Sequence, residues 1–348
     1  MANGGIIGKR LIPTKDAAKG TWGINEIYHA RLDDIWPLHG VLLVNTDFLI
    51  IAGGGGGGAV GTPSPGTDHP SAQSGGGAGG YLNSYGSEYS GGNSASLSSL
   101  GLGSQLEYSV TIGAGGAIAT NGSNTSFSGL AFNDSSISLV AIGGGAGGDY
   151  GSTSAGGGSD GGSGGGGGHD EYTQTYNVNE WPPGSGTTNQ GFGGGTHYMT
   201  RDTSLEAFCN AFGGIYCKVQ LLRGGGGGGA GGVGAASTPY NGQGGAGLAS
   251  SITGTSVMRA VGGSGRGTHG GVNGSMPAGS GSSSHGGGGE GGSTTNTGGD
   301  GVVILRYPSG YTVSNPDGNL TITHTTTGSD RVSSITAGSG IIKLVSAS

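Results

Sequence analysis

Short apolar runs that lead directly into consecutive glycines restrict the fold of this chain more than any other feature. The glycine-rich stretches cover residues 53–58, 143–148, 224–229 and 262–263, and the apolar runs before them cover residues 48–52, 137–142, 219–223 and 257–261. Glycine loses more backbone entropy on ordering than any other residue, so an ordered glycine run must be stabilised by main-chain hydrogen bonds and close packing. Four occurrences indicate an architecture rather than independent turns.

Two conformations of these runs compete. Gly/Ser-rich tracts commonly form flexible linkers. Alternatively, the runs adopt the extended threefold polyproline II conformation, whose N–H and C=O groups pair with neighbouring runs. The chain has 90 glycines in 348 residues but only 11 prolines and no three-residue repeat, which argues against collagen. Its 9% of charged residues lacks the charge that keeps disordered chains solvated, so we expect an ordered polyglycine bundle.

The segments between the glycine runs predict β-strands. Strand-like apolar patterns, several alternating with period two and bounded by turn residues, occur at residues 106–112, 137–142, 302–307, 319–324 and 340–345. We therefore expect a mainly β protein, a small sheet or sandwich with polyproline-II-type glycine runs packed as a bundle. The glycine runs would project from the strand ends.

Residues 1–40 differ from the rest of the chain, with few glycines and two of the three tryptophans. Apolar residues recur at helical spacing from Ile24 to Ile35, and Pro37 follows as a stop signal. The pattern predicts a short N-terminal helix. Because a helix of about twelve residues is marginal alone, its apolar stripe must dock either on its own domain or on another protein.

Residues 169–223 hold eight of the chain's 22 aromatic residues in under a sixth of its length. Four of them lie among polar neighbours or near a Pro-Pro pair and are the candidates for a binding surface: Tyr172, Tyr176, Trp181 and Tyr198. Exposed aromatic rings beside Asn, Gln and Ser are typical of adaptable binding surfaces.

The same segment predicts a small fold of its own. Residues 203–206 read as a capping box that begins a helix carrying Phe208 and Phe212, and a strand is expected over residues 215–222. Cys209 and Cys217 are the only cysteines. A disulfide across the intervening turn is geometrically possible, and buried free thiols are the alternative in a reducing cytoplasm.

Several function classes are disfavoured by composition and motifs. With 13 Lys and Arg against 20 Asp and Glu, the chain has no basic cluster for nucleic acid. No apolar stretch approaches the roughly 20 residues that span a bilayer, and the N-terminus lacks the apolar core of a signal peptide. Adjacent residues point to opposite faces of an extended chain, so residues 169–171 (His-Asp-Glu) cannot readily bind one ion. We expect no enzyme activity, no metal and no cofactor.

The order of motifs along nearly the whole chain resembles glycine-rich structural proteins of tailed bacteriophages, particularly aquatic ones. The matching stretches are residues 19–31 (KGTWGINEIYHAR) with the Trp-Pro pair at 36–37, and residues 47–58, 108–116, 124–127, 250–255 and 298–308. The aromatic-rich segment 169–223 departs from this pattern and reads as an insertion.

The resemblance implies a virion protein assembled in the host cytoplasm, a tail fibre or adhesin whose loops bind a host surface glycan or outer-membrane protein. It implies attachment to other virion proteins through Trp22, Ile27, Tyr28 and Trp36, and a homo-oligomeric or multi-copy assembly. A capsid decoration or neck/collar protein without receptor binding is the alternative, and an ice-binding protein is a third class disfavoured by the lack of regular threonine spacing. The expected segments are 1–40 (attachment), 41–168 and 224–308 (glycine-rich body), 169–223 (insert) and 309–348 (C-terminal β segment).

Overall fold

A computed structural model describes residues 41–59, 71–149, 156–170, 181–201, 219–238, 242–267, 284–292 and 296–347. The chain divides into two compact units, Met1–Leu42 and Leu43–Ser348, and the second unit is described here by itself. The expected N-terminal helix and the attachment residues Trp22, Ile27, Tyr28 and Trp36 lie outside the described residues. So do the expected helix at 203–206 and onward, Cys209 and Cys217.

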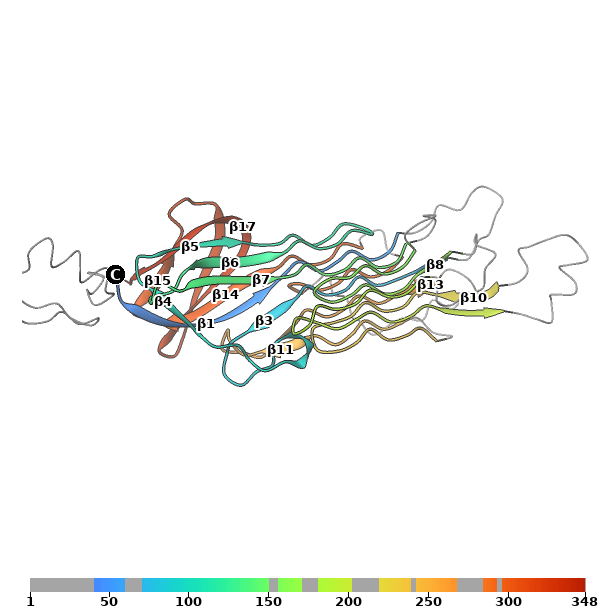
Figure 1. Cartoon of the computed structure of the whole chain (residues 1–348), viewed down its shortest axis with the longest axis horizontal. Helices are drawn as coiled ribbons and strands as arrows, with labels where there is room; N and C mark the ends of the chain where they lie inside the picture. The colour runs from blue at the N-terminus through green and yellow to red at the C-terminus, as the bar shows by residue number, and fades with distance from the viewer. Residues whose placement is uncertain are drawn as a thin grey trace, which may run out of the picture. The chain divides into compact units, whose positions relative to one another are not determined.

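The described residues are mainly β-strand and extended chain (Figure 1). The strands are β1 (Leu43–Ile51), β2 (Ser71–Gln73), β3 (Tyr81–Asn83), β4 (Leu100–Gly103), β5 (Glu107–Thr111), β6 (Thr125–Leu130), β7 (Ser136–Ala141), β8 (His169–Asp170), β9 (Tyr198–Arg201), β10 (Val219–Arg223), β11 (Leu248–Ser250), β12 (Val257–Arg259), β13 (Arg266–Gly267), β14 (Val302–Pro308), β15 (Tyr311–Ser314), β16 (Leu320–Thr327) and β17 (Asp330–Ser346), with one 3-10 turn, η1 (Gly91–Asn93). The strands predicted at residues 106–112, 137–142, 302–307, 319–324 and 340–345 are confirmed as β5, β7, β14, β16 and part of β17. The mainly β fold class is therefore confirmed.

Ten strands form one antiparallel sheet in the order β3-β1-β14-β17-β5-β6-β7, with β4 on β1 and with β15 and β16 on β17. The long strand β17 serves two parts of this sheet, because residues 330–335 pair with β14 and residues 339–343 pair with β5. Between them Gly338 has a φ of 100°, a left-handed conformation that favours glycine. The sheet thereby encloses a core whose largest members are Phe48, Tyr108, Phe127 and Tyr307.

The second half of strand β1, from Phe48 to Ile51, is buried on both faces, which accounts for its continuous apolar sequence. Phe48 and Ile50 belong to the core just described, whereas Leu49 and Ile51 belong to a second cluster with Tyr81 and Ile252. All four β1 side chains are at most 1% exposed. The main chain leaves this doubly buried strand and enters the glycine run at residues 53–58 without a turn.

The glycine run at residues 53–58 is ordered and has threefold symmetry in its hydrogen bonds. Its amides donate in rotation to three segments at N···O distances of 2.8 to 3.1 Å: Gly53 and Gly56 to Ser123 and Thr120, Gly54 and Gly57 to Gly299 and Asn296, and Gly55 and Gly58 to Gly77 and Ser74. Each neighbour recurs after three residues, which is the repeat of the polyproline II helix. The carbonyls of the run accept from three further segments, at residues 116–119, 144–147 and 289–292.

The run therefore has six neighbours, three antiparallel segments to which it donates and three parallel segments from which it accepts. Residues 224–229 follow the same rule and donate in rotation to segments 263–266, 164–167 and 232–235. Figure 1 shows these runs side by side beyond the ends of β1, β3 and β7. The expected polyglycine bundle is confirmed for the described runs, and the flexible-linker alternative does not hold there.

Close packing explains why these positions are glycine. A Cβ atom placed on any residue of 53–58 or 224–229 would lie well within 3.0 Å of a main-chain atom of a neighbouring run, a separation that real Cβ atoms essentially never show. The backbones touch each other directly, and no side chain separates them. Main-chain hydrogen bonds and backbone contact thus take the place of a side-chain core.

Candidate binding end of the glycine bundle

The chain reverses repeatedly at the end of the glycine bundle that lies away from the ten-stranded sheet. The Gly58 amide donates to the Ser74 carbonyl (2.8 Å), so the two ends of the chain on either side of residues 60–70 lie side by side. Likewise, the Gly168 amide donates to the Gly156 carbonyl (3.2 Å). Hairpin strands β9 and β10 flank the gap between residues 201 and 219. Small β-ladders made by β2, β8 and β13 lie at this end, which we call the distal end (Figure 1).

Trp181 lies at the distal end and packs against the bundle. Its indole ring covers Gly156, where a Cβ would come within 2.5 Å of the ring carbon Cε3. The residue is half-buried, and its indole Nε1 is buried without a hydrogen-bond partner among the described residues. The next residue, Pro182, accepts a hydrogen bond from the Gly158 amide (2.9 Å), so the Pro-Pro pair begins a further extended run.

Tyr198 opens β9 at the same end and is half-buried opposite Arg223 of β10. Gly167 links the positions of the two aromatic residues. Its amide donates to the Gly195 carbonyl (2.9 Å), three residues before Tyr198, and a Cβ on Gly167 would lie 2.7 Å from the Trp181 carbonyl oxygen. Of the four predicted binding residues, these two are therefore both placed at the distal end, and Tyr172 and Tyr176 lie outside the described residues.

Buried polar groups hold the base of the β9–β10 hairpin. Arg223 is 3% exposed, and burial lowers the pKa of its guanidinium. The Ser237 hydroxyl donates to the Arg223 carbonyl (2.9 Å), and the Ser237 amide donates to the Thr196 carbonyl (3.0 Å). The strand predicted at residues 215–222 is confirmed over its described part, because β10 begins at Val219. The hairpin that carries Tyr198 is thus fixed to the bundle by a third segment.

The described middle of segment 169–223 belongs to the bundle. Gly184 donates to Gly165 (2.8 Å), Gly195 donates to Gly226 (2.8 Å), and Phe192 donates to Gly229 (3.1 Å). An aromatic-rich segment can join a glycine bundle because glycine occupies positions that touch neighbouring runs, such as Gly184, where a Cβ would lie well within 3.0 Å of the Ser159 carbonyl. The connecting residues 171–180 and 202–218 are bounded by described residues at the distal end.

Two kinds of residue with defined roles were missed by sequence reasoning. Asn121 and Asn124 place their Oδ1 atoms on the amides of Ala146 and Gly143 (both 2.8 Å), where none of the described runs supplies a carbonyl. Their three-residue spacing matches the repeat of the run and was the available signal. Arg259 and His285, which line a pocket at the sheet end of the bundle, are lone residues between glycine runs and gave no signal.

The described ranges offer no cluster of three or more His, Cys, Asp or Glu side chains suited to a metal ion. His169 and Asp170 lie in β8, whose backbone pairs with Ser71 and Ala72. A membrane-crossing helix would have to be long and apolar, and none of this kind occurs in the part of the chain that the structure describes.

These features define a β protein in which a side-chain-packed antiparallel sheet continues into a main-chain-packed glycine bundle. The family model described as glycine-rich domain matches residues 41–308, and the chain belongs to this family. The match begins two residues before β1 and ends with the last residue of β14. No curated protein and no solved structure matched the chain.

Proposed function

We propose that this chain is a structural protein of a tailed-phage virion, a tail fibre or adhesin whose distal loops bind a host surface. One observation carries the proposal: a rigid bundle brings several chain reversals, with Trp181 and Tyr198, to one end. Loops held on a rigid scaffold can change without altering the scaffold, and binding residues concentrate in such loops. The resemblance to glycine-rich phage proteins supplies the virion context.

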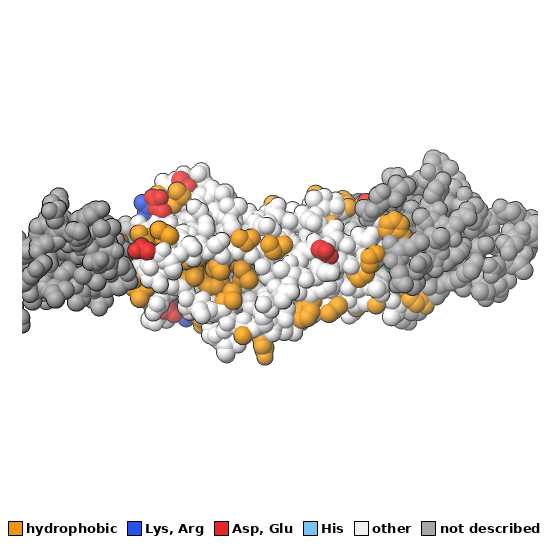
Figure 2. Space-filling model, viewed as in Figure 1, with side chains coloured by type: hydrophobic (Ala, Val, Ile, Leu, Met, Phe, Trp, Pro, Cys, Tyr) orange, Lys and Arg blue, Asp and Glu red, His pale blue; other side chains and the backbone are white. Residues whose placement is uncertain are grey.

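The chemistry of the distal end suits a glycan or an outer-membrane protein as receptor. Aromatic rings stack on the apolar faces of sugars and of protein side chains while their polar atoms bond outward. Figure 2 shows that the visible face of the described sheet and bundle carries few charged side chains and consists mostly of backbone, uncharged polar and hydrophobic groups. Few long charged side chains would have to be ordered if such a surface bound a partner. The half-buried indole of Trp181 is held in place by Gly156, so it is preorganised for contact.

In the proposed assembly, residues 1–40 attach the protein to other virion proteins through Trp22, Ile27, Tyr28 and Trp36, and several copies assemble together. Deleting residues 1–40 should abolish incorporation into particles and leave the body, which begins at Leu43, folded. Incorporation and circular dichroism of the truncated protein test the two parts of this statement. Normal incorporation of a folded truncation would remove the attachment role from this segment.

Cell binding is the decisive experiment, and the structure determines which variants are informative. Deleting all of 169–223 would remove residues 184–195, whose amides and carbonyls pair within the bundle. More specific variants keep these bundle residues. They replace only residues 171–180 or 202–218 with Gly-Ser linkers, or carry the substitutions Trp181→Ser and Tyr198→Ser. The matched control is Tyr89→Ser, because Tyr89 is a tyrosine 60% exposed on the loop after β3.

Fluorescently labelled full-length protein should bind the bacteria that a phage carrying it infects, and the distal variants should lose binding at least tenfold. The Tyr89→Ser control should bind as the unmodified protein does. Equal binding by all folded variants would refute a distal receptor site. No binding by the intact protein would favour the alternative of a capsid decoration or neck/collar protein, which labelling of particles by electron microscopy would then locate.

A further inference from the structure

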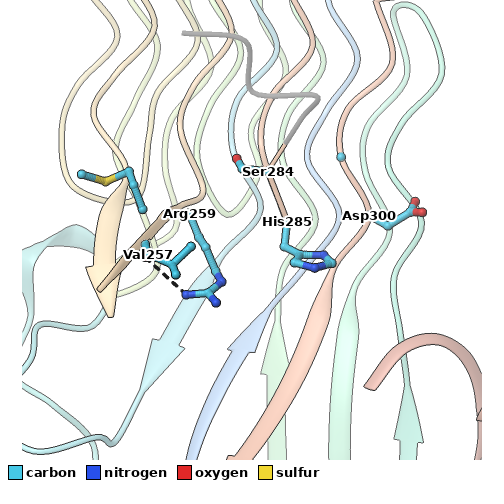
Figure 3. A pocket seen from close by; sticks show the side chains of 7 residues that line it. Val257, Arg259, Ser284, His285 and Asp300 are labelled. Carbon is cyan, nitrogen blue, oxygen red and sulfur yellow. Dashed lines mark hydrogen bonds between the residues drawn. The ribbon is translucent and has the colours of Figure 1, made fainter. Parts of the chain in front are cut away.

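A pocket of about 400 Å³ lies where the sheet passes into the glycine bundle, remote from the distal end (Figure 3). Three segments form it: Val257, Met258 and Arg259 of β12, Ser284 and His285 at the start of one glycine run, and Gly299 with Asp300 in the run before β14. The Ala260 amide donates to the His285 carbonyl (3.1 Å), and the Gly286 amide donates to the Asp300 carbonyl (2.9 Å), so main-chain bonds fix the three segments together.

Arg259 is a buried cation without an ion-pair partner among the described residues. It is only 6% exposed, and its Nη1 donates to the carbonyl of Val257 (3.3 Å) while Nε has no hydrogen-bond partner. Burying a guanidinium without a direct ion pair is costly, and burial is the main reason that its pKa is lowered. Glu88, whose carboxylate accepts the Ser251 amide (2.7 Å) and the Asn83 side chain (3.2 Å), forms no ion pair with Arg259 in the described structure, but its negative charge raises the pKa of the guanidinium and offsets part of the effect of burial.

The other polar groups of the pocket do not neutralise Arg259. In Figure 3 the Asp300 carboxylate points away from the Arg259 guanidinium and from the His285 ring. That carboxylate accepts the Gly115 amide through Oδ1 (2.8 Å), which accounts for its direction. Burial is the main reason that the pKa of His285 is lowered, and the charge of Arg259 lowers it further, so the ring is mainly neutral near pH 7.

Apolar side chains complete the pocket. Met258 is 53% exposed and Val257 is 38% exposed, although both lie on a strand beside a buried cluster. A ligand that occupied this space would bring an anionic group to the guanidinium and an apolar or carbon-rich face to these two side chains. Arginine binds the two oxygens of a carboxylate or phosphate with parallel hydrogen bonds, and such bonds are strongest when shielded from water.

We propose that this pocket binds a small organic oxyanion, a carboxylate or phosphate ester of about monosaccharide size, with Arg259 as the anion-binding residue. The inference does not depend on the proposed adhesin role, because the site is separate from the distal end. The ligand's charge would compensate a buried cation at the junction of sheet and bundle. Binding should therefore also stabilise the folded chain.

The test is isothermal titration calorimetry of the full-length protein with glucuronic acid, glucose 6-phosphate, inorganic phosphate and neutral glucose. We expect at least one organic anion to bind, glucose to bind at least tenfold more weakly, and the melting temperature to rise with the bound anion. Binding of glucuronic acid alone would identify a carboxylate site, and binding of glucose 6-phosphate alone a phosphate site. Failure of both organic anions to bind at 10 mM concentrations, or inorganic phosphate binding as tightly as the best of them, would overturn the proposal.

Two variants separate the site from general folding. Arg259→Gln should weaken binding at least tenfold, and Arg266→Gln, a basic residue of β13 whose side chain is 48% exposed, should leave it unchanged. Met258→Glu adds a negative charge at an exposed position of the pocket and should abolish binding even if Arg259→Gln fails to fold. Unchanged affinity in a folded Met258→Glu or Arg259→Gln protein would show that the anion binds elsewhere.

Discussion

The sheet is stabilised by the packing of side chains, whereas the glycine bundle is stabilised by main-chain hydrogen bonds and contact between backbones. In the sheet, Phe127 stacks on Tyr108 with ring centroids 5.5 Å apart. Each of the two strands that carry these residues pairs with two neighbours: β5 with β17 and β6, and β6 with β5 and β7. In the bundle, residues 53–58 exchange main-chain bonds with six neighbours and bury no side chain of their own. A side-chain core can relax around a smaller residue, whereas contact between backbones cannot relax around a larger one.

This difference is tested most strongly by adding one methyl group to the bundle. Gly226→Ala would place a Cβ well inside 3.0 Å of the carbonyl of Gln243, and the surrounding atoms are all backbone. We expect a loss of about 4 kcal/mol or more in the free energy of unfolding, enough to prevent accumulation of soluble protein. Urea denaturation monitored by circular dichroism, or the soluble yield where the variant does not fold, measures the effect.

The matched control for Gly226→Ala is Gly310→Ala. Gly310 lies in the turn between β14 and β15, has open space around the Cβ position and does not require a positive φ. Its substitution should change stability by less than about 0.5 kcal/mol. Equal stability of the two alanine variants would contradict direct backbone contact in the bundle.

The next largest effect is expected from removing a side chain in the sheet. Phe127→Ala empties a fully buried position between β5 and β7 and should cost about 3–5 kcal/mol. Because β6 continues from the run at residues 119–124, which pairs with residues 53–58, we expect sheet and bundle to unfold in one transition. Hydrogen exchange followed by mass spectrometry should then show equal protection loss in both regions. Retained protection of the bundle amides alone would show that the two regions are independent.

The fold was predictable where it depends on composition and local pattern. The apolar runs before glycines indicated strands that continue into polyproline II segments, because only buried strands tolerate a sequence such as residues 48–52 and only glycines allow backbones to touch. The alternation in residues 106–112 located β5, with Tyr108 and Val110 facing the core. Trp181 and Tyr198 were expected to be exposed, but both are half-buried, Trp181 through its packing on Gly156, and their role in binding stays a prediction.

The pairing of the runs could not be predicted, because consecutive glycines have no side chains to distinguish one partner or register from another. Register is set by elements at the run ends and edges, such as the Gln190 side chain that accepts the Ile142 amide (2.8 Å). Only residues 340–345 of β17 were predicted as a strand; the earlier part of β17 and the left-handed φ of Gly338 were not. The pocket at Arg259 depends on three segments brought together only by those pairings.

A smaller effect is expected at the edge of the bundle, where side chains replace a missing run. Asn121→Leu keeps the approximate volume but removes the oxygen that accepts the Ala146 amide. The loss should be about 1 kcal/mol, with a similar loss for Asn124→Leu and a sum of the two in the double variant. Urea denaturation measures all three. A loss as large as that of Gly226→Ala would mean that edge contacts, rather than interior packing, dominate the stability of the bundle.

The smallest expected effect is a dependence of stability on pH that involves both regions. Burial lowers the pKa of His285 at the pocket and of His324 in β16, whose Nδ1 lies 2.8 Å from the Ser333 hydroxyl oxygen. A lowered pKa means that the unfolded chain binds the proton more tightly, so stability is complete above the unfolded pKa of about 6.5 and declines as pH falls toward the folded values. Melting temperatures between pH 8 and pH 5.5 should fall, and less so in His285→Asn and His324→Asn, because above about pH 5.5 few carboxylates titrate. A protein that carries both substitutions should show the weakest pH dependence. If it kept the full pH dependence, the two histidines would not cause the loss of stability, and the junction would tolerate a second positive charge beside Arg259.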